Sequence, residues 1–299
     1  MLSICIAIHN WDVNQLVADL RMQAAKLGVP YEILLLDDAS DYDFQLKNAH
    51  LDFEEDVTYM QSYVNLGRSR VRNTLAVKAK YEYLLFMDCD TRVCRKDYLK
   101  KYMTMLSAPV VSGGYEYKKR RPKKDCVLRW AYGRAREEIP AEKRNLQPNI
   151  AFSTFNFLIQ KKIFKKVQFD ETLQGYGHED TLFGLELQEN GISVTHIDNP
   201  LRHEVVCPTE KFLQQTENSI DNLLVIAQKV QNPDKFVQSI ALLRTFDKLR
   251  KWHCVGCYRL FYNTFRKIIR KNLYSLKPKM RNFDFYKLGY LCEKSKHIK

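Results

Sequence analysis

The sequence lacks long apolar runs, glycine-rich phosphate loops and the two Cys-x-x-Cys pairs of a typical zinc site. No stretch reaches about 18 consecutive apolar residues, so we expect no membrane-spanning helix. Neither Gly-x-Gly-x-x-Gly nor Gly-x-x-x-x-Gly-Lys-Ser/Thr occurs among the 11 glycines, which argues against a dinucleotide oxidoreductase and a P-loop enzyme. The eight cysteines are scattered, and the single Cys-x-x-Cys, Cys254 to Cys257, has no second pair at zinc-site spacing. We therefore expect reduced thiols packed in helices in preference to disulfides or a zinc site.

Acidic residues are scarce in only one part of the chain. The 299 residues carry a formal charge of +13, yet residues 1–243 hold 32 basic and 32 acidic side chains. Residues 244–299 hold 16 basic and 3 acidic ones, so the whole excess belongs to this segment. No nucleic-acid reader motif accompanies it, and we predict no nucleic-acid partner. With 45% apolar and 12% aromatic residues, the chain can bury a large core.

The N-terminal segment has no secretory pattern. Its apolar run has no basic residues before it and stops at His9, which is too short for a signal peptide. We therefore expect a cytoplasmic protein.

Apolar runs alternate with helical patterns through the first 205 residues. The runs Leu2–Ile8, Glu32–Leu36, Val57–Tyr63 and Tyr83–Met87 are typical of buried strands, and Arg68–Ala79 of a helix. Strands that alternate with helices through short connections predict an α/β fold, in which helices flank a mostly parallel central sheet.

Two of the predicted strands end in acidic pairs. Asp37 and Asp38 follow the second strand, and Asp88 and Asp90 follow the fourth. Ligands of such sheets bind beyond the carboxyl ends of the strands, so these side chains are candidates for chemistry. Carboxylates gathered there suit a hard divalent cation such as Mg²⁺ or Mn²⁺. The alternative is that they are solvated turn residues.

A second acidic pair follows a glycine loop. Gly175 and Gly177 flank a tyrosine and precede Glu179 and Asp180 at the start of a helical pattern. Two adjacent acids can divide the tasks of binding a hydroxyl and removing its proton, although acids also simply favour a helix N-terminus. His203 is either a structural histidine or an imidazole ligand that supplements the carboxylates on a metal ion.

Four segments in one order resemble those of family 2 glycosyltransferases. They are the first strand ending at Asn10, then Glu32–Ser40, Asn65–Asn73 and Phe86–Asp90. Residues 150–205 resemble the catalytic segment of galactosyltransferase-type enzymes. The resemblance implies the glycosyltransferase A-type, Rossmann-like fold.

The same resemblance implies an organisation of the chain. Residues 1–110 would form the nucleotide-sugar-binding half of one domain, and residues 111–209 its acceptor and catalytic half. A helical C-terminal extension, basic from position 244, would occupy residues 210–299.

The resemblance also implies roles for particular positions. The residues implied for binding the nucleotide sugar are Ala7, Asn10, Asp38, Arg68 and Asp88. Asp90 and His203 would ligate Mn²⁺ or Mg²⁺. Asp180 would be the general base, and Glu179 would hold the acceptor.

The function implied is an inverting, metal-dependent glycosyltransferase that moves a hexose or an N-acetylhexosamine. Its donor would be a nucleotide-diphosphate sugar, most often a UDP-sugar, and its acceptor a hydroxyl of a glycan or lipid-linked molecule in cell-surface polysaccharide synthesis. The alternative is a non-catalytic glycan- or membrane-binding protein on a transferase scaffold. The intact set of acids and His203 argues against that alternative.

Residues 254–273 predict an amphipathic helix. Its basic residues fall on one face, and its apolar face consists of Tyr258, Phe261, Phe265, Ile268 and Ile269. Such a helix can lie in an anionic membrane surface, and we expect peripheral attachment to the inner face of the cell membrane. The alternative is a helix docked on the catalytic domain with a solvated basic face.

Overall fold

The computed structural model describes residues 1–173, 175–204 and 206–295, in two compact units. With those gaps, unit 1 comprises Met1–Lys118, Glu137–Gln174 and Glu179–Val205, and unit 2 comprises Lys119–Arg136, Gly175–His178 and Val206–Lys299. The predicted segments 111–209 and 210–299 contain positions 174, 205 and 296–299, which lie outside the described residues.

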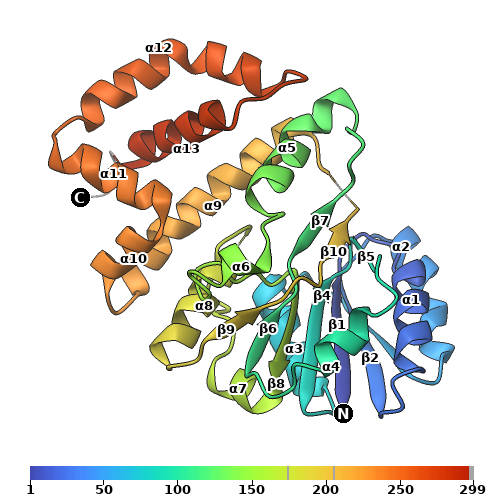
Figure 1. The fold of residues 1–299 in the computed structure, drawn as a ribbon. Helices are drawn as coiled ribbons and strands as arrows, with labels where there is room; N and C mark the ends of the chain where they lie inside the picture. The colour runs from blue at the N-terminus through green and yellow to red at the C-terminus, as the bar shows by residue number, and fades with distance from the viewer. Residues whose placement is uncertain (174, 205, 296–299) are drawn as a thin grey trace. The chain divides into compact units, whose positions relative to one another are not determined.

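Unit 1 is built on a seven-stranded sheet of order β3-β2-β1-β4-β8-β6-β9 (Figure 1). Its strands are β1 (Leu2–Ile8), β2 (Tyr31–Asp38), β3 (Val57–Ser62), β4 (Tyr83–Asp88), β6 (Val110–Ser112), β8 (Asn156–Gln160) and β9 (Val194–His196). Neighbouring strands are parallel except that β8 is antiparallel to both β4 and β6. The predicted α/β fold with a mostly parallel sheet is confirmed, and the four predicted strands match β1 to β4 within one or two residues at their ends.

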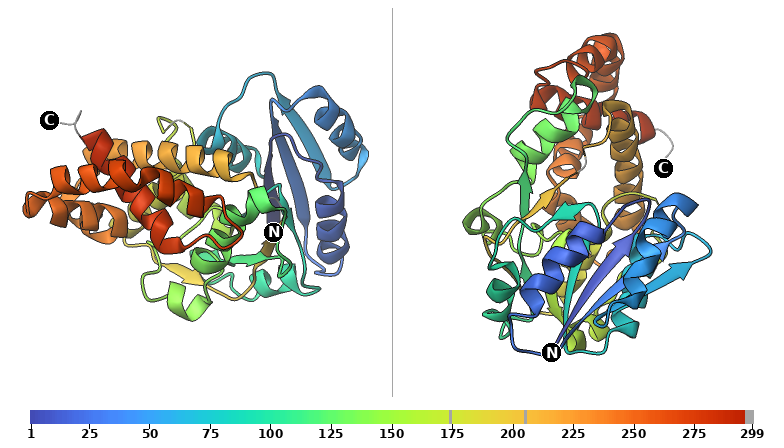
Figure 2. Two further views of the ribbon diagram at one scale, coloured as in Figure 1. Left: turned by 90° about the horizontal axis from the view of Figure 1, so that it is seen from above. Right: turned by 90° about the vertical axis from the view of Figure 1, so that its right-hand side faces the viewer.

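Helices cover both faces of this sheet. They are α1 (Asn14–Ala24), α2 (Tyr42–Ala49), α3 (Arg68–Lys78), α4 (Tyr98–Met103), α6 (Ala141–Arg144), α7 (Lys161–Lys166) and α8 (Glu179–Glu189), with a 3₁₀ turn η1 (His50–Phe53) after α2. Side chains of a strand alternate between faces, so Ile4 and Ile6 pack with Leu20 of α1, whereas Cys5 packs with Leu75 of α3. Figure 2 shows α1 and α3 on opposite sides of the strands. Burial on both faces explains why the strands are almost wholly apolar.

A small second sheet joins three distant segments of unit 1. Its strands, in the order β5-β10-β7, are β5 (Thr91–Arg92), β10 (Leu201–His203) and β7 (Tyr115–Tyr117). The central strand β10 is antiparallel to β5 and parallel to β7. This sheet therefore brings the chain just after β4 beside the chain around position 203.

Unit 2 is helical. It contains a 3₁₀ turn η2 (Lys124–Cys126) and the helices α5 (Val127–Arg136), α9 (Thr209–Lys229), α10 (Pro233–Ser239), α11 (Ala241–Lys251), α12 (Val255–Leu273) and α13 (Met280–Lys294). Helices α12 and α13 lie side by side (Figure 1), and a Cβ atom at Gly289 would come within 2.2 Å of the Tyr262 ring. Only glycine allows this close approach. Within the described residues, no helix is long and apolar enough to cross a membrane.

The predicted helix over residues 254–273 corresponds to α12, but the five apolar residues expected on one face separate in the structure. Ile269 is only 5% exposed and packs in the core of unit 2 with Tyr262, and Tyr258 packs against the same core. Ile268 is 65% exposed, and Phe261 and Phe265 are exposed as well. The helix therefore packs by one side within unit 2, while a second apolar side faces outward.

Candidate active site

The carboxyl ends of β1, β2 and β4 lie beside one another at one edge of the central sheet. The strand register pairs Ala7 with Asp88 and Ile8 with Asp37, and Asp38 is the last residue of β2. The two acidic strand ends predicted for this edge are therefore neighbours across β1. This is the edge at which ligands bind in sheets of this topology.

Asp38 holds the loop that leads into α3. Its Oδ1 accepts a hydrogen bond from the Leu66 amide at 2.5 Å, and its Oδ2 accepts one from the Gly67 amide at 3.1 Å. The next residue is Arg68, the first of α3. The carboxylate thus fixes the start of that helix, and its remaining lone pairs are what it can offer a ligand.

Asn10 ties the turn after β1 to the turn after β2. It has a φ of 51°, in the left-handed region that asparagine tolerates. Its side-chain oxygen accepts a hydrogen bond from the Asp41 backbone amide at 2.7 Å, and the Asn10 backbone amide donates to the Ser40 hydroxyl at 2.8 Å.

Ala7, which is also predicted to bind the nucleotide sugar, is half-buried and pairs with Asp88 across the sheet. Its methyl group places no polar atom there.

A buried arginine joins three elements of unit 1. Arg72 of α3 is 4% exposed, and its Nη2 donates to Asp88 Oδ1 at 2.9 Å. Its Nη1 lies 3.6 Å from Oε1 of Glu179 in α8, and Arg68 Nη1 lies 3.5 Å from the same oxygen. A buried guanidinium needs charged partners, and here two acids predicted for the site supply them. Arg72 therefore joins Asp88 to Glu179, and Glu179 in turn lies beside Arg68.

Sequence reasoning missed Arg72. It belongs to the motif Asn65–Asn73 and stands four residues after Arg68 in a predicted helix, a spacing that puts both on one helical face. That spacing could have indicated Arg72 as a site residue. Its acidic partner Asp88 could not be inferred from the spacing, because the two residues meet only when β4 and α3 pack together.

Asp90 and His203, which are more than a hundred residues apart in the chain, face each other. The pairing of β5 with β10 sets His203 opposite Thr91, and the Glu204 amide donates to the Asp90 carbonyl at 2.9 Å. As a result, His203 Nε2 lies 3.3 Å from Asp90 Oδ2. The small sheet thus brings together the two residues predicted to ligate a metal ion.

This pair fits a divalent cation. Two ligand atoms bound at right angles to a cation at about 2.1 Å lie about 3 Å from each other, close to the observed spacing. The rings of Tyr117 and Phe155 pack against His203, whose buried Nδ1 has no hydrogen-bond partner among the residues that the structure describes. A carboxylate oxygen with an imidazole nitrogen suits Mn²⁺ in particular. Within the described residues, no group of three or more His, Cys, Asp or Glu side chains forms a metal site. Phosphate oxygens and water commonly complete such a coordination shell.

Asp180 has the properties of a general base. It lies half-buried in the first turn of α8, and its Oδ1 accepts a hydrogen bond from the Thr181 amide at 2.7 Å. Burial, and after it the negative charge of Glu179, raises the pKa of Asp180 to about 7, while the cations Arg72 and Arg68 act in the opposite direction. A base whose pKa lies near neutrality accepts a proton efficiently at neutral pH.

Aromatic side chains link Asp180 to the Asp90–His203 pair. The Tyr115 ring stacks on Phe155 at a centroid distance of 4.0 Å, and Phe155 also packs against His203. Burial raises the pKa of the Tyr115 hydroxyl well above its ordinary value, and the charge of Asp180 adds to this shift. All the predicted site residues belong to unit 1.

Comparison with known proteins identifies what this arrangement resembles. The sequence model of the family described as glycosyl transferase family 2 matches residues 3–168. No curated protein sequence matches the chain.

Several solved structures share the fold. One is the mannosyltransferase PcManGT from Pyrobaculum calidifontis in complex with GDP-Man and Mn²⁺, with a TM-score of 0.60 and 14% identity over 99% of this chain and 86% of that one. TarS 1-349 of S. aureus has a TM-score of 0.51 and 17% identity over 99% and 91%. Glucosyl-3-phosphoglycerate synthase from Mycobacterium tuberculosis, in complex with Mn²⁺, UDP and glucosyl-3-phosphoglycerate, has a TM-score of 0.52 and 12% identity over 75% and 79%. At these identities, the likeness establishes the glycosyltransferase A-type fold.

Proposed function

The chain belongs to glycosyl transferase family 2, and from this membership we propose that it is an inverting, metal-dependent enzyme. Its donor is a nucleotide-diphosphate sugar, for which a UDP-sugar is our first choice. The group transferred is a hexose or an N-acetylhexosamine. The acceptor is a hydroxyl of a glycan or of a lipid-linked molecule, in the synthesis of a cell-surface polysaccharide.

The observation that carries this proposal is the Asp90–His203 pair, which lies at metal-ligand spacing in the unit that also contains the base Asp180. Asp90 and His203 lie 3.3 Å apart, and the charge of Asp180 acts on Tyr115, whose ring stacks on a neighbour of His203. These three residues come from separate parts of the chain. A scaffold without activity has no physical need to hold them in this arrangement.

The residues divide the chemistry of a single displacement. Asp90 and His203 would hold a divalent cation, which when bound stabilises the negative charge that develops on the leaving diphosphate. Asp180 accepts the proton of the acceptor hydroxyl as that oxygen attacks the anomeric carbon. Glu179 accepts a hydrogen bond from the acceptor sugar. Attack from the face opposite the leaving group gives inversion at that carbon.

The donor occupies the edge formed by β1, β2 and β4. Asp88, oriented by Arg72, faces the ribose or the sugar, and Arg68 neutralises charge near the base or the diphosphate. The nucleotide base lies against Ala7, Asn10 and Asp38. Because two amides already occupy Asp38, its part is to fix the loop before α3 and to accept one further hydrogen bond.

A screen of nucleotide sugars tests this function directly. We expect one donor to be hydrolysed slowly by the full chain with Mn²⁺, and hydrolysis to stop when the metal is chelated. Transfer to an acceptor hydroxyl then gives the product of inverted anomeric configuration, which proton NMR identifies. Equal release of sugar with and without metal would overturn the metal dependence. Failure to bind any nucleotide sugar would favour a non-catalytic glycan-binding protein.

We also propose that the outward side of α12 attaches the protein to the inner face of the cell membrane. Leu260, Phe261, Phe265 and Ile268 form an exposed apolar surface on this helix, and Leu260 is 71% exposed. Lys271 adjoins this surface, in the segment that carries the whole excess charge of the chain. Apolar side chains beside cations are what an anionic membrane interface binds.

Substitution of the two most exposed residues of this surface tests the attachment. We expect Leu260→Ser/Ile268→Ser to lower the partition constant for anionic vesicles, measured by flotation, by about 30-fold or more, because the two aliphatic side chains together lose at least about 2 kcal/mol of burial. The control, Leu46→Ser/Leu146→Ser, removes two equally exposed leucines from unit 1 and should float like the unchanged protein. Equal flotation of both variants would contradict membrane attachment through α12.

A further inference from the structure

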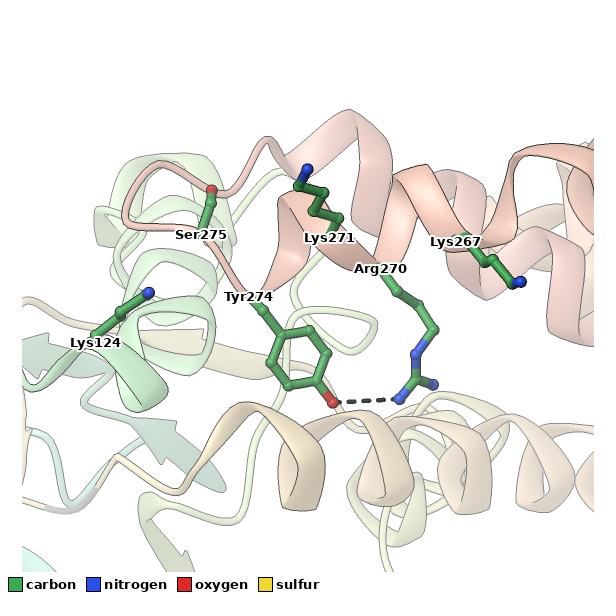
Figure 3. A pocket seen from close by; sticks show the side chains of 6 residues that line it. All are labelled: Lys124, Lys267, Arg270, Lys271, Tyr274 and Ser275. Atoms are coloured by element: carbon green, nitrogen blue, oxygen red, sulfur yellow. Dashed lines mark hydrogen bonds between the residues drawn. The ribbon is translucent and has the colours of Figure 1, made fainter.

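A basic cavity lies within unit 2, where α12 ends. It has a volume of about 600 Å³ and is drawn in Figure 3. One residue of η2, three of α12 and two of the following turn line it: Lys124, Lys267, Arg270, Lys271, Tyr274 and Ser275. Four of these six side chains are cations and none is acidic. The cavity therefore concentrates anions.

Three of the four cations have no carboxylate partner among the described residues. Some other cations of unit 2 are paired with acids, as Arg266 is with Glu293 at 3.9 Å. In the part of the chain that the structure describes, no carboxylate lies within ion-pair distance of Lys124, Lys267 or Lys271. Their mutual repulsion is therefore left uncompensated at this cavity, and a bound anion would relieve it.

The fourth cation already binds an acidic oxygen. Arg270 Nη2 lies 3.1 Å from Oε2 of Glu210, a mostly exposed residue of α9, and donates to the Tyr274 hydroxyl at 3.2 Å (Figure 3). The Tyr274 hydroxyl in turn donates to the same Glu210 oxygen. Glu210 therefore occupies the position at the guanidinium that an incoming anion would take.

We propose that this cavity binds a phosphate-bearing group. A phosphate carries up to two negative charges and three acceptor oxygens, so it can satisfy several cations at once. The guanidinium of Arg270 can bind two of those oxygens, and Lys267 and Lys271 add two further cations to the lining of the cavity. A single carboxylate offers less charge to the same donors.

The site is distinct from the one proposed for the nucleotide sugar, because all its residues belong to unit 2 and all the donor-site residues belong to unit 1. Its volume admits a diphosphate or the phosphate headgroup of a lipid. These two ligands share the chemistry that the cavity recognises, and they differ in whether the phosphate is soluble or lies in a membrane.

Calorimetric titration of the full chain with inorganic pyrophosphate tests the proposal. EDTA is included so that metal-dependent binding of a diphosphate in unit 1 does not contribute. We expect Lys267→Ala/Lys271→Ala to raise the dissociation constant by about tenfold or more, because two charged hydrogen-bond donors are lost. The control, Lys235→Ala/Lys248→Ala, removes two exposed lysines of unit 2 outside the cavity and should change it less than about twofold.

A third variant separates binding in the cavity from attraction to the overall charge. Glu210→Gln frees Arg270 from its competitor, so we expect it to tighten pyrophosphate binding by about threefold or more. Equal weakening by the two lysine pairs, weaker binding by Glu210→Gln, or no binding at all would each overturn the proposal.

Flotation with phosphatidylcholine vesicles that contain phosphatidic acid identifies the source of the phosphate. If Lys267→Ala/Lys271→Ala reduces flotation with these vesicles more than with phosphatidylserine vesicles of equal charge, relative to the control pair, the ligand is a lipid phosphate headgroup. If flotation is equal while pyrophosphate affinity falls, the ligand is a soluble phosphate. Both results support phosphate recognition by the cavity.

Discussion

Replacement of Asp180 by asparagine is expected to lower the rate of sugar transfer by about 10²- to 10⁴-fold, with the affinity for the nucleotide sugar nearly unchanged. The amide keeps the shape of the side chain and can no longer take the proton of the acceptor hydroxyl. The donor-binding residues proposed at the edge of β1, β2 and β4 are untouched. Transfer corrected for donor hydrolysis, together with calorimetric titration of the nucleotide diphosphate, measures the two effects separately.

The pH dependence of transfer should come from the same carboxyl group. Burial, followed by the charge of Glu179, raises the pKa of Asp180 to about 7, and only the ionised form accepts a proton. We therefore expect activity to fall about tenfold per pH unit below pH 7 and to level off above it. The asparagine variant should lose this dependence.

Folding stability gives an independent readout with a definite sign. Because the folded-state pKa of Asp180 is raised above its unfolded value, stability contributed by this group is lost as pH rises toward the folded pKa. Asp180→Asn should therefore raise the free energy of unfolding more at about pH 8 than at about pH 4.

The matched control is Glu189→Gln, an exposed acid at the end of the same helix α8. It should leave both transfer and its pH profile unchanged. Unchanged turnover in Asp180→Asn, or equal losses in both variants, would remove Asp180 from the role of base.

His203→Ala is expected to weaken Mn²⁺ binding by about 10²-fold and to reduce transfer at least as strongly. It removes one of the two protein ligands proposed for the cation and leaves Asp90 alone at the site. The electron paramagnetic resonance signal of free Mn²⁺, followed during titration in the presence of UDP, measures the affinity without requiring turnover.

His50→Ala provides the comparison, because His50 is an exposed histidine of unit 1 in the 3₁₀ turn after α2. It should bind Mn²⁺ like the unchanged protein. Asp90→Asn should reproduce the loss seen in His203→Ala. Normal Mn²⁺ affinity in either ligand variant would rule out the metal site at β5 and β10.

Local sequence patterns were enough to predict the strands of the central sheet and the acids at their carboxyl ends. The short apolar runs that became β1 to β4 end at their acids because a strand buried on both faces admits polar side chains only where it leaves the sheet. Parallel order followed from the helices between the strands, and it placed Asp38 and Asp88 at one edge. Glu179 and Asp180 could be placed at a helix start from the glycines and the apolar spacing around them.

Other features were not accessible from local patterns. The strands β5 and β10 have two and three residues, too few for any periodicity, and yet their pairing sets His203 against Asp90. Arg72 lies in a motif that was recognised, but the motif does not say which acid lies across from its helix. On α12, periodicity identified the helix and missed that Ile269 packs inward while Ile268 faces outward.

The sequence by itself therefore determined the fold class, the family and the sheet edge at which the acids Asp38 and Asp88 lie, because these depend on the order of residues over distances of a few turns or strands. Only the tertiary structure decided that Asp90 meets His203, that Arg72 joins Asp88 to Glu179, and that the end of α12 forms a basic cavity. These contacts join residues far apart in the chain. Their geometry is set by how strands pair and helices pack. The spacing of residue types within one segment does not predict such contacts between distant segments.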